Sequence, residues 1–191
     1  MGYGTVGSGV YEVIKKNQVS INKKVGQELK VQYVLDLREF PGDPVMDVLT
    51  HDFEDIIKDD EVKIVAEVMG GLHPAYEFTK RCLEAGKSVC TSNKELVAEH
   101  GAELIRIAKD HQVNYLFEAS VGGGIPIIRP LNSSLTADVI VEISGILNGT
   151  TNYMLTKMSR EGLNYGDVLK EAQAKGYAEL RPEADVEGWD R

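Results

Sequence analysis

The stretch Gly2-Tyr3-Gly4-Thr5-Val6-Gly7 matches the pattern G-x-G-x-x-G of nucleotide-binding turns. In this pattern the glycines permit a tight turn, a close approach of the backbone to a pyrophosphate, and close packing of the helix that follows. A helix is predicted over Val10–Lys16, and its N-terminal amides and partial positive charge suit phosphates. The six residues alone are a weak signal, so the surrounding chain must decide their meaning.

About the first hundred residues alternate short β-branched runs with longer segments of helical period, which is typical of a parallel sheet with crossover helices. The expected strands are Val31–Leu35, Val62–Val68, Ser88–Cys90 and Asn114–Phe117. The clearest helix begins near Glu95, and another covers Tyr76–Ala85 and ends at Gly86 as its C-cap. We therefore expect an α/β fold with a Rossmann-type, doubly wound parallel sheet.

Two features near the glycine-rich turn complicate this expectation. The turn begins one residue after the start of the sequence, so the strand that normally precedes it is expected to be missing. Asp36 ends the next strand and suits the free 2′-hydroxyl of NAD, whereas the nearby Arg38 suits the 2′-phosphate of NADP, so both coenzymes stay open. Asp36 also lies farther from Gly7 than the usual ~20 residues. The segment Asn17–Lys30 is therefore either an extension of the first helix or a polar insertion.

The character of the chain changes after Glu118. The following residues, Ala-Ser-Val-Gly-Gly-Gly-Ile-Pro, are too rich in glycine for the interior of a strand or helix. Beyond them we expect a longer apolar strand over Val139–Leu147 and helices over Thr150–Lys157 and Tyr165–Ala174. The sequence thus predicts a coenzyme-binding domain over residues 1–119 and the start of a smaller α/β domain over residues 120–191.

Composition excludes several classes of function. The formal net charge of -9 and the pI near 5.0 disfavour nucleic acid as a partner, because phosphate binding relies on lysine and arginine. Cys82 and Cys90 lack the paired spacing of a zinc site, so we interpret them as reduced, buried thiols. No apolar run approaches the ~18 residues of a membrane span, and no secretory signal opens the chain. These features predict a cytoplasmic protein with no membrane partner.

Four long segments, in order, resemble the signature segments of homoserine dehydrogenases. They are Thr91-Ser-Asn-Lys-Glu-Leu-Val-Ala, Phe117-Glu-Ala-Ser-Val-Gly-Gly-Gly-Ile-Pro-Ile-Ile, Gly145-Ile-Leu-Asn-Gly-Thr-Thr-Asn-Tyr, and Gly176-Tyr-Ala-Glu with its continuation Ala184-Asp-Val-Glu-Gly-Trp-Asp190. The resemblance covers nearly the whole chain. It implies reversible, NAD(P)-dependent interconversion of L-homoserine and L-aspartate 4-semialdehyde on the route to threonine and methionine. It also implies a Rossmann-type domain joined to a smaller catalytic domain that forms a homodimer.

The resemblance also assigns roles to residues of this chain. Gly4, Thr5, Val6 and Gly7, with Gly2 of the same turn, are expected to hold the coenzyme phosphates; Gly70, Ser92 and Lys94 flank the nicotinamide, and Gly176 closes on it. Glu179, Asp185 and Asp190 match acidic positions around the substrate, where carboxylates suit the homoserine ammonium group and hydroxyl. Lys94 and Asp190 are the expected catalytic residues in this chain. The principal catalytic lysine of the family lies four residues beyond the Asp190 position, after Arg191, so the chain alone is expected to be inactive.

A monovalent-cation site is implied at the junction of the two domains. In the family it is formed by the side chain matching Glu118 and by the carbonyls matching Val121, Gly123 and Ile125. Such an all-oxygen set suits a hard cation such as Na⁺ or K⁺. The competing interpretation is that these glycines only make a tight interdomain crossing, and the two interpretations are compatible.

Homoserine dehydrogenase is the leading hypothesis for function. The alternative from another class is a catalytically inactive nucleotide-binding or dimerisation module, since the sequence lacks both the central strand and the principal lysine. Another oxidoreductase of amino-acid metabolism is disfavoured because the resemblance extends through the substrate loop. An upstream apolar strand and a downstream lysine in the coding DNA would distinguish these hypotheses.

Overall fold

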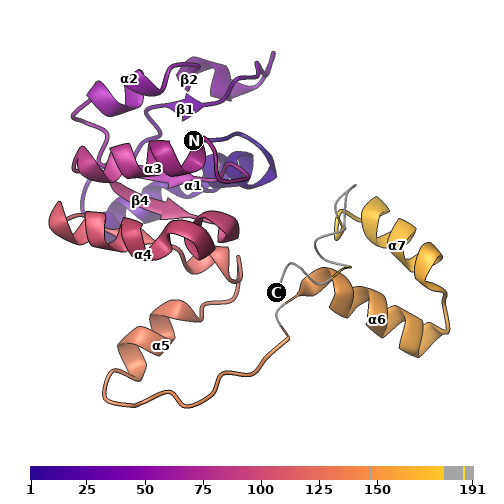
Figure 1. The fold of residues 1–191 in the computed structure, drawn as a ribbon. Helices are drawn as coiled ribbons and strands as arrows, with labels where there is room; N and C mark the ends of the chain where they lie inside the picture. Colours follow the sequence, from indigo (N-terminus) through magenta and orange to yellow (C-terminus); the bar gives the residue numbers. More distant parts are fainter. Residues whose placement is uncertain (147, 179–186, 188–191) are drawn as a thin grey trace. The chain divides into compact units, whose positions relative to one another are not determined.

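The computed structural model describes residues 1–146, 148–178 and 187. The chain divides into two compact units, Met1–Thr136 and Ala137–Arg191, and each is described by itself. The first unit contains all the strands of the described residues, and the second contains a pair of helices (Figure 1).

Parallel strands form two sets in the first unit. β1 (Val34–Leu35) pairs with β2 (Leu49–Thr50). β3 (Ile64–Glu67), β4 (Ser88–Thr91) and β5 (Tyr115–Leu116) form a second set in the order β3-β4-β5. All pairings are parallel, so the carboxyl ends of neighbouring strands meet at one edge. The parallel sheet expected from the β/α alternation is confirmed.

Met1 and Gly2 lie between the two sets of strands. The Met1 nitrogen donates to the Ala66 carbonyl at 2.7 Å, and the Met1 carbonyl accepts from the Val68 N–H at 3.0 Å. The Gly2 N–H donates to the Leu35 carbonyl at 2.8 Å. These two residues therefore bond to β3 on one side and to β1 on the other, in the position that a central strand takes in a doubly wound sheet. Before β1, the described residues contain no strand that is longer than this two-residue segment.

The helices pack on both faces of the strands. α3 (Ala75–Glu84) and α4 (Lys94–Asp110) lie together in front of the strands, with α1 (Thr5–Val25) behind (Figure 1). Two apolar clusters match these layers. One contains the fully buried Leu83, Leu96 and Leu104 of α3 and α4. The other joins Tyr11 of α1 to β1 and to the short 3-10 helix η1 (Pro44–Val48).

Helix boundaries settle two details that the sequence left open. α1 ends at Val25, and its C-cap Gly26 has a left-handed φ of +80°. The segment Asn17–Lys30 is therefore mainly an extension of the first helix. α3 ends at Glu84 with Ala85 as its C-cap. Gly86, expected to be the cap itself, follows it at φ +74°. α2 (Phe53–Lys58) was not predicted, because six residues are too few to show a helical period.

Three further α-helices follow the last strand in the part of the chain that the structure describes. After η2 (Glu118–Ser120), α5 (Ile128–Ser134) belongs to the first unit. In the second unit, α6 (Gly149–Glu161) packs on α7 (Tyr165–Ala174) around the buried residues Met154, Val168, Ala172 and Ala178. Both predicted helices of this region are confirmed. Among the described helices, none combines the length and apolar character that crossing a bilayer requires.

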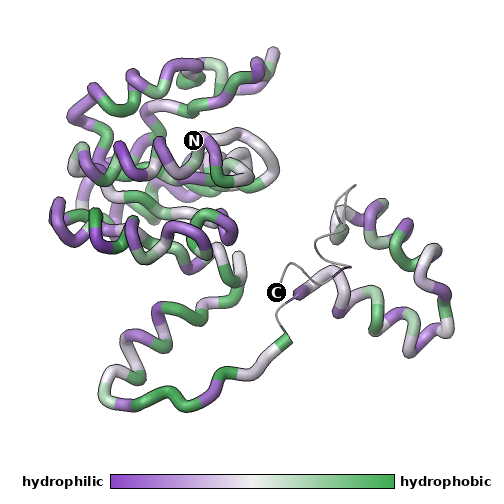
Figure 2. Tube along the Cα trace, viewed as in Figure 1, coloured by the Kyte–Doolittle hydropathy of each residue, from purple (hydrophilic) through white to green (hydrophobic). Residues whose placement is uncertain are grey.

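The strand predicted over Val139–Leu147 is wrong for its described part. Residues 139–146 form no strand, although Figure 2 shows that this segment is apolar over much of its length. Val139 and Val141 are 88% and 95% exposed. Apolar composition alone does not make a strand, because the backbone N–H and C=O groups of a strand need a neighbour to bond. No strand of the described residues pairs with this segment, and Leu147 lies outside those residues.

The packing of Gly7 on Gly2 generates a prediction about stability. A Cβ added at Gly7 would lie 2.1 Å from the Gly2 carbonyl oxygen, whereas one added at Gly9, in the same helix, meets nothing within 4 Å. We expect Gly7→Ala to lower the free energy of unfolding by about 1–3 kcal/mol, as overpacking does. Gly9→Ala is the matched control and should raise it by up to ~1 kcal/mol, because alanine favours helix. Urea denaturation of the three proteins measures both effects, and a Gly7→Ala protein as stable as the parent would contradict the packing argument.

Candidate functional site

The glycine-rich turn places the N-terminus of α1 at the edge of the sheet. α1 begins at Thr5, its N-cap Gly4 has no side chain, and Gly4, Thr5 and Val6 are exposed. The first amides of a helix have no partner within the helix, so these groups and the helix dipole face outward and suit an anion. Gly2 has φ +91°, a conformation that side chains disfavour, and a Cβ there would lie 3.1 Å from the Val68 carbonyl. Glycine is thus required at both ends of the turn.

Asp36 ties this turn to the carboxyl end of β1. Its Oδ2 accepts from the Tyr3 N–H at 2.8 Å, and its two oxygens together accept from the Arg38 N–H at 3.0 Å and from Arg38 Nε and Nη2 at 2.9 Å each. Arg38 Nη2 also donates to the Tyr3 carbonyl at 3.2 Å. The guanidinium lies over the Phe40 ring, with 5.2 Å from Cζ to the ring centroid. One carboxylate therefore holds both the turn and the arginine.

The two charges of this pair differ in exposure. The Asp36 side chain is 9% exposed and that of Arg38 is 61% exposed. The side-chain hydrogen bonds from Arg38 hold the pKa of Asp36 well below its ordinary value, with the N–H donors of Arg38 and Tyr3 acting in the same direction against partial burial. Asp36 is thus ionised, and its charge is covered by a guanidinium that faces solvent.

A buried polar network joins the carboxyl ends of β3 and β4. Glu67 is fully buried; its carboxylate accepts from the Thr91 hydroxyl at 2.5 Å and from the Met69 N–H at 2.8 Å. The Thr91 oxygen accepts from the Asn93 N–H at 2.9 Å. The Asn93 side chain donates to the Gly71 carbonyl at 2.7 Å and accepts from the Leu96 N–H, which caps α4. The network links two loops and the start of a helix.

The structure brings most of the predicted coenzyme residues to one edge. The turn from Gly2 to Gly7 contacts Asp36 through Tyr3, and Gly2 lies against Val68 and Met69, which lead into Gly70. Ser92 and Lys94 follow β4 beside the Glu67 network. Gly176 belongs to the second unit, where it follows α7 at φ +72°. Glu179, Asp185 and Asp190 lie outside the described residues.

The resemblance assigns no role to Glu67, and it contains Thr91 and Asn93 only as part of the segment that begins at Thr91. The available signal was the position of Glu67, a charged residue inside the apolar run Ile64-Val-Ala-Glu-Val-Met. A charge in such a run needs buried partners, because an unpaired buried carboxylate is costly. The chain offers the Thr91 hydroxyl opposite it in the parallel register of β3 and β4.

Glu118, the predicted cation ligand, caps the start of α5 in this structure. Its carboxylate accepts from the N–H groups of Ile127, Ile128 and Arg129, the last two at 2.9 and 2.8 Å. Desolvation raises the pKa of Glu118, but the three backbone donors outweigh it and the pKa is lowered. Val121, Gly123 and Ile125 lie in the loop between Glu118 and α5. Within the described residues, no group of three His, Cys, Asp or Glu side chains is arranged to hold a metal.

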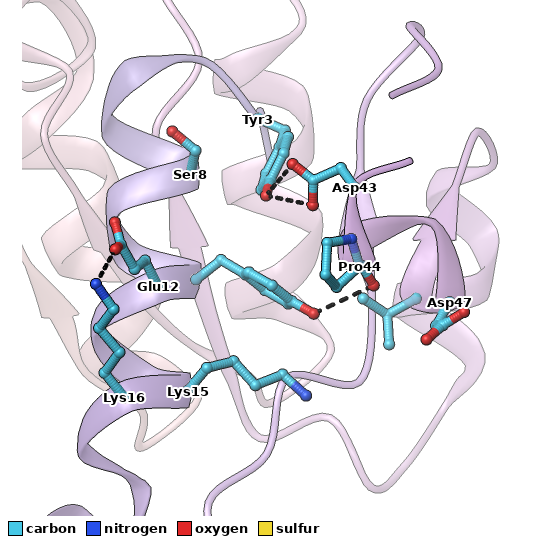
Figure 3. A pocket seen from close by; sticks show the side chains of 10 residues that line it. Tyr3, Ser8, Glu12, Lys15, Lys16, Asp43, Pro44 and Asp47 are labelled. Carbon is cyan, nitrogen blue, oxygen red and sulfur yellow. Dashed lines mark hydrogen bonds and ion pairs between the residues drawn. The ribbon is translucent and has the colours of Figure 1, made fainter. Parts of the chain in front are cut away.

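A hollow of about 580 Å³ lies beside the glycine-rich turn, between the side of α1 and η1 (Figure 3). Its walls carry tyrosine rings and charges of both signs: Tyr3, Ser8, Tyr11, Glu12, Lys15, Lys16, Asp43, Pro44, Asp47 and Val48. None of the predicted coenzyme residues lines it. The hollow runs along the flank of α1 rather than over its N-terminal amides, so we place the anion-binding groups at the turn and not in this hollow.

Comparison with known families tests the origin of this arrangement. The model for the NAD-binding domain of homoserine dehydrogenase matches residues 2–118, and the model for homoserine dehydrogenase matches residues 126–191. The chain belongs to the homoserine dehydrogenase family. The family expected from the four sequence segments is thereby confirmed.

Individual homoserine dehydrogenases match over the full chain. Those of Bacillus subtilis and Synechocystis are each 44% identical to this chain over 193 residues. Both matches cover 100% of this chain, but only 45% of the Bacillus protein and 44% of the Synechocystis protein. The chain thus spans about half the length of the curated relatives it matches. Two solved structures agree in fold. A homoserine dehydrogenase from Thiobacillus denitrificans has a TM-score of 0.88 at 41% identity and covers 99% of this chain and 44% of that one. A hyperthermophilic archaeal homoserine dehydrogenase in complex with NADPH has a TM-score of 0.83 at 30% identity, with 99% and 64% coverage.

Asp36 gives a prediction about pH dependence. Because its pKa in the folded chain is lower than its ordinary value of 3.8, the ionised carboxylate stabilises the fold above that pH, and this stabilisation is lost as the pH falls below it. Asp36→Asn should therefore be less stable than the parent at neutral pH, and the difference in unfolding free energy should narrow below about pH 3.8. Urea titrations from neutral pH to about pH 3 measure it. A difference that stays constant over this range would show that the charge of Asp36 is not what holds the turn.

Proposed function

We propose that a protein containing this chain catalyses the reversible, NAD(P)-dependent interconversion of L-homoserine and L-aspartate 4-semialdehyde, in threonine and methionine biosynthesis. Two findings together support the proposal. The turn Gly2–Gly7 lies at a sheet edge suited to a coenzyme, and both homoserine dehydrogenase models match the chain. Residues 1–119 form the coenzyme-binding domain in this proposal. Residues 120–191 begin the substrate and dimerisation domain.

The coenzyme fits the turn and the sheet edge. The pyrophosphate would bind at the start of α1, from Gly4 to Gly7, where Gly4, Thr5 and Val6 are exposed and the helix dipole favours negative charge. The close packing of Gly7 on Gly2 leaves no side chain between the helix and the sheet. Gly70, Ser92 and Lys94 would flank the nicotinamide, which would supply the hydride-transfer chemistry, and Gly176 is the further position that the resemblance assigns to the nicotinamide side.

Arg38 favours NADP over NAD as the coenzyme. Asp36 is nearly covered, and its oxygens already accept four hydrogen bonds, so it is poorly placed to take the ribose 2′-hydroxyl as well. The guanidinium of Arg38 is exposed and held in place, which suits a 2′-phosphate. In this proposal Asp36 positions Arg38, and Arg38 binds the phosphate.

Replacing Arg38 tests this assignment. Arg38→Met should weaken binding of NADPH to the chain by about tenfold to a hundredfold, the loss of a charge-assisted bond to phosphate, and should change NADH binding by less than about twofold. Arg106→Met, at an exposed position of α4, is the matched control and should change neither. Fluorescence titration measures the dissociation constants of NADPH and NADH for the parent and for both variants. Equal weakening of NADPH and NADH by Arg38→Met would contradict a phosphate-specific role.

The remaining roles rest on the family. Glu179, Asp185 and Asp190 supply the acidic groups that bind the homoserine ammonium group and orient its hydroxyl. Lys94 orients the reacting groups from the end of β4. We also propose that the whole protein is a cytoplasmic homodimer.

The proposal includes a Na⁺ or K⁺ ion. Its ligands would be the Glu118 side chain and the carbonyls of Val121, Gly123 and Ile125. These are all oxygen ligands and suit a hard cation. Both carboxylate oxygens of Glu118 already accept backbone N–H groups at the start of α5. Cation binding by the carboxylate therefore requires that these bonds be shared or released.

The activity is tested in a chimera. Residues 1–191 replace the matching segment of the Bacillus subtilis enzyme, and reduction of NADP⁺ and NAD⁺ is followed with and without L-homoserine. We expect homoserine-dependent reduction, and a decrease of about 10² or more in kcat for Lys94→Met, as for a group that acts on the reacting atoms. Circular dichroism and NADPH binding show whether each protein is folded. A folded chimera that binds coenzyme but shows no homoserine-dependent reduction would instead support the nucleotide-binding module.

A further inference from the structure

Glu67 is the most deeply buried ionisable side chain of the described residues around the candidate site. It has no exposed surface, and it lies at the carboxyl end of β3, the edge at which parallel sheets bind ligands. A carboxylate is an expensive group to bury, and a leucine or methionine would fill similar space at lower cost. Its presence therefore calls for an explanation in what its oxygens hold.

The directions of the hydrogen bonds indicate what Glu67 does. One oxygen accepts from the Met69 N–H at 2.8 Å, and the other accepts from the Thr91 hydroxyl at 2.5 Å. Thr91 donates its only hydrogen to Glu67 and is thereby oriented to accept from the Asn93 N–H. Asn93 in turn donates to the Gly71 carbonyl. The carboxylate is thus the final acceptor of a chain of bonds that crosses between two strand ends.

The members of this chain alternate with the residues assigned to the nicotinamide side. Gly70 lies between Met69, which Glu67 holds by its N–H, and Gly71, which Asn93 holds by its carbonyl. Ser92 lies between Thr91 and Asn93, and its own N–H donates to the Glu67 carbonyl at 3.3 Å. Lys94 follows Asn93, the N-cap of α4. Each of these three site residues therefore has a neighbour that the network fixes.

We propose that Glu67 is a positioning residue for the nicotinamide half of the coenzyme: through Thr91 and Asn93 it sets the backbone of Gly70, Ser92 and Lys94. This inference rests on the proposed function and adds to it a residue that touches neither coenzyme nor substrate. The adenosine half is positioned separately, by the bonds of Asp36 to Tyr3 and Arg38. The two halves of the coenzyme site should therefore respond independently to substitution.

The test compares the whole coenzyme with a fragment that lacks nicotinamide. The 191-residue chain is titrated with whichever of NADPH and NADH binds it more tightly, and with the matching fragment, 2′,5′-ADP or ADP. Glu67→Gln keeps the size but gives the network an amide where it needs an acceptor. We expect it to weaken binding of the dinucleotide about tenfold or more, as for loss of one bond to a charged group, and that of the fragment less than about twofold. A general loss of structure would weaken both ligands alike.

Two controls keep the result interpretable. Glu103→Gln removes a carboxylate that accepts from Tyr76 and Lys80 between α3 and α4, away from the strand ends, and should leave both ligands unchanged. Thr91→Val removes the hydroxyl with little change in shape and should reproduce the effect of Glu67→Gln, whereas Thr91→Ser restores the hydroxyl and should restore binding. If Glu67→Gln does not fold by circular dichroism, the two Thr91 variants decide the question.

Each outcome has a distinct meaning. Selective weakening of the dinucleotide by Glu67→Gln and Thr91→Val, with rescue by Thr91→Ser, supports the positioning role. Unchanged binding of the dinucleotide by the folded variants, or equal weakening of dinucleotide and fragment, overturns it. A parent chain that binds neither NADPH nor NADH overturns the coenzyme site on which the proposed function rests, and that result is distinguishable because it does not depend on any substitution.

Discussion

The close approach of α1 to the turn that precedes it fixes where the helix meets the strands. Gly7 packs so tightly on the Gly2 carbonyl that no Cβ fits between them. This contact brings the first amides of α1 to the edge of the sheet, while Met1 and Gly2 bond to β3 and β1 on either side. The N-terminal end of the helix, with its free backbone amides, and the carboxyl ends of the parallel strands thus meet at one place.

Two acidic side chains, each at the end of a strand, stabilise the two sides of this edge in different ways. Asp36 lies at the surface, covered by Arg38, and holds the glycine-rich turn through the Tyr3 N–H. Glu67 is buried and holds the loops after β3 and β4. Burial raises the pKa of Glu67 and its bonds from Thr91 and Met69 only partly offset this, whereas the bonds from Arg38 lower that of Asp36. The two pKa values move in opposite directions because burial dominates at Glu67, whereas the hydrogen bonds from Arg38 dominate at Asp36.

Much of the first unit follows from the sequence, because glycine spacing and hydrophobic period report directly on turns and amphipathic helices. The turn at Gly2–Gly7 and the long helix α4 are examples. The strand expected at Val139–Leu147 shows the limit: apolar residues indicate a segment that can be buried, but not which strand will pair with it. Glu67 shows another, since its side-chain partner Thr91 comes from a different strand, 24 residues away along the chain. The acidic positions 179, 185 and 190 remain predictions, since they lie outside the described residues.

We infer that the coenzyme site lies at the edge formed by Gly2–Gly7 and the ends of β3 and β4. The most direct test is a titration of the ¹⁵N-labelled chain with NADPH, followed by NMR of its backbone amides. We expect the largest shifts at residues 4–7 and 70–71, with little change along α6 and α7. Shifts concentrated instead around Lys15 and Asp47, in the hollow beside α1, or no saturable shifts at all, would contradict it.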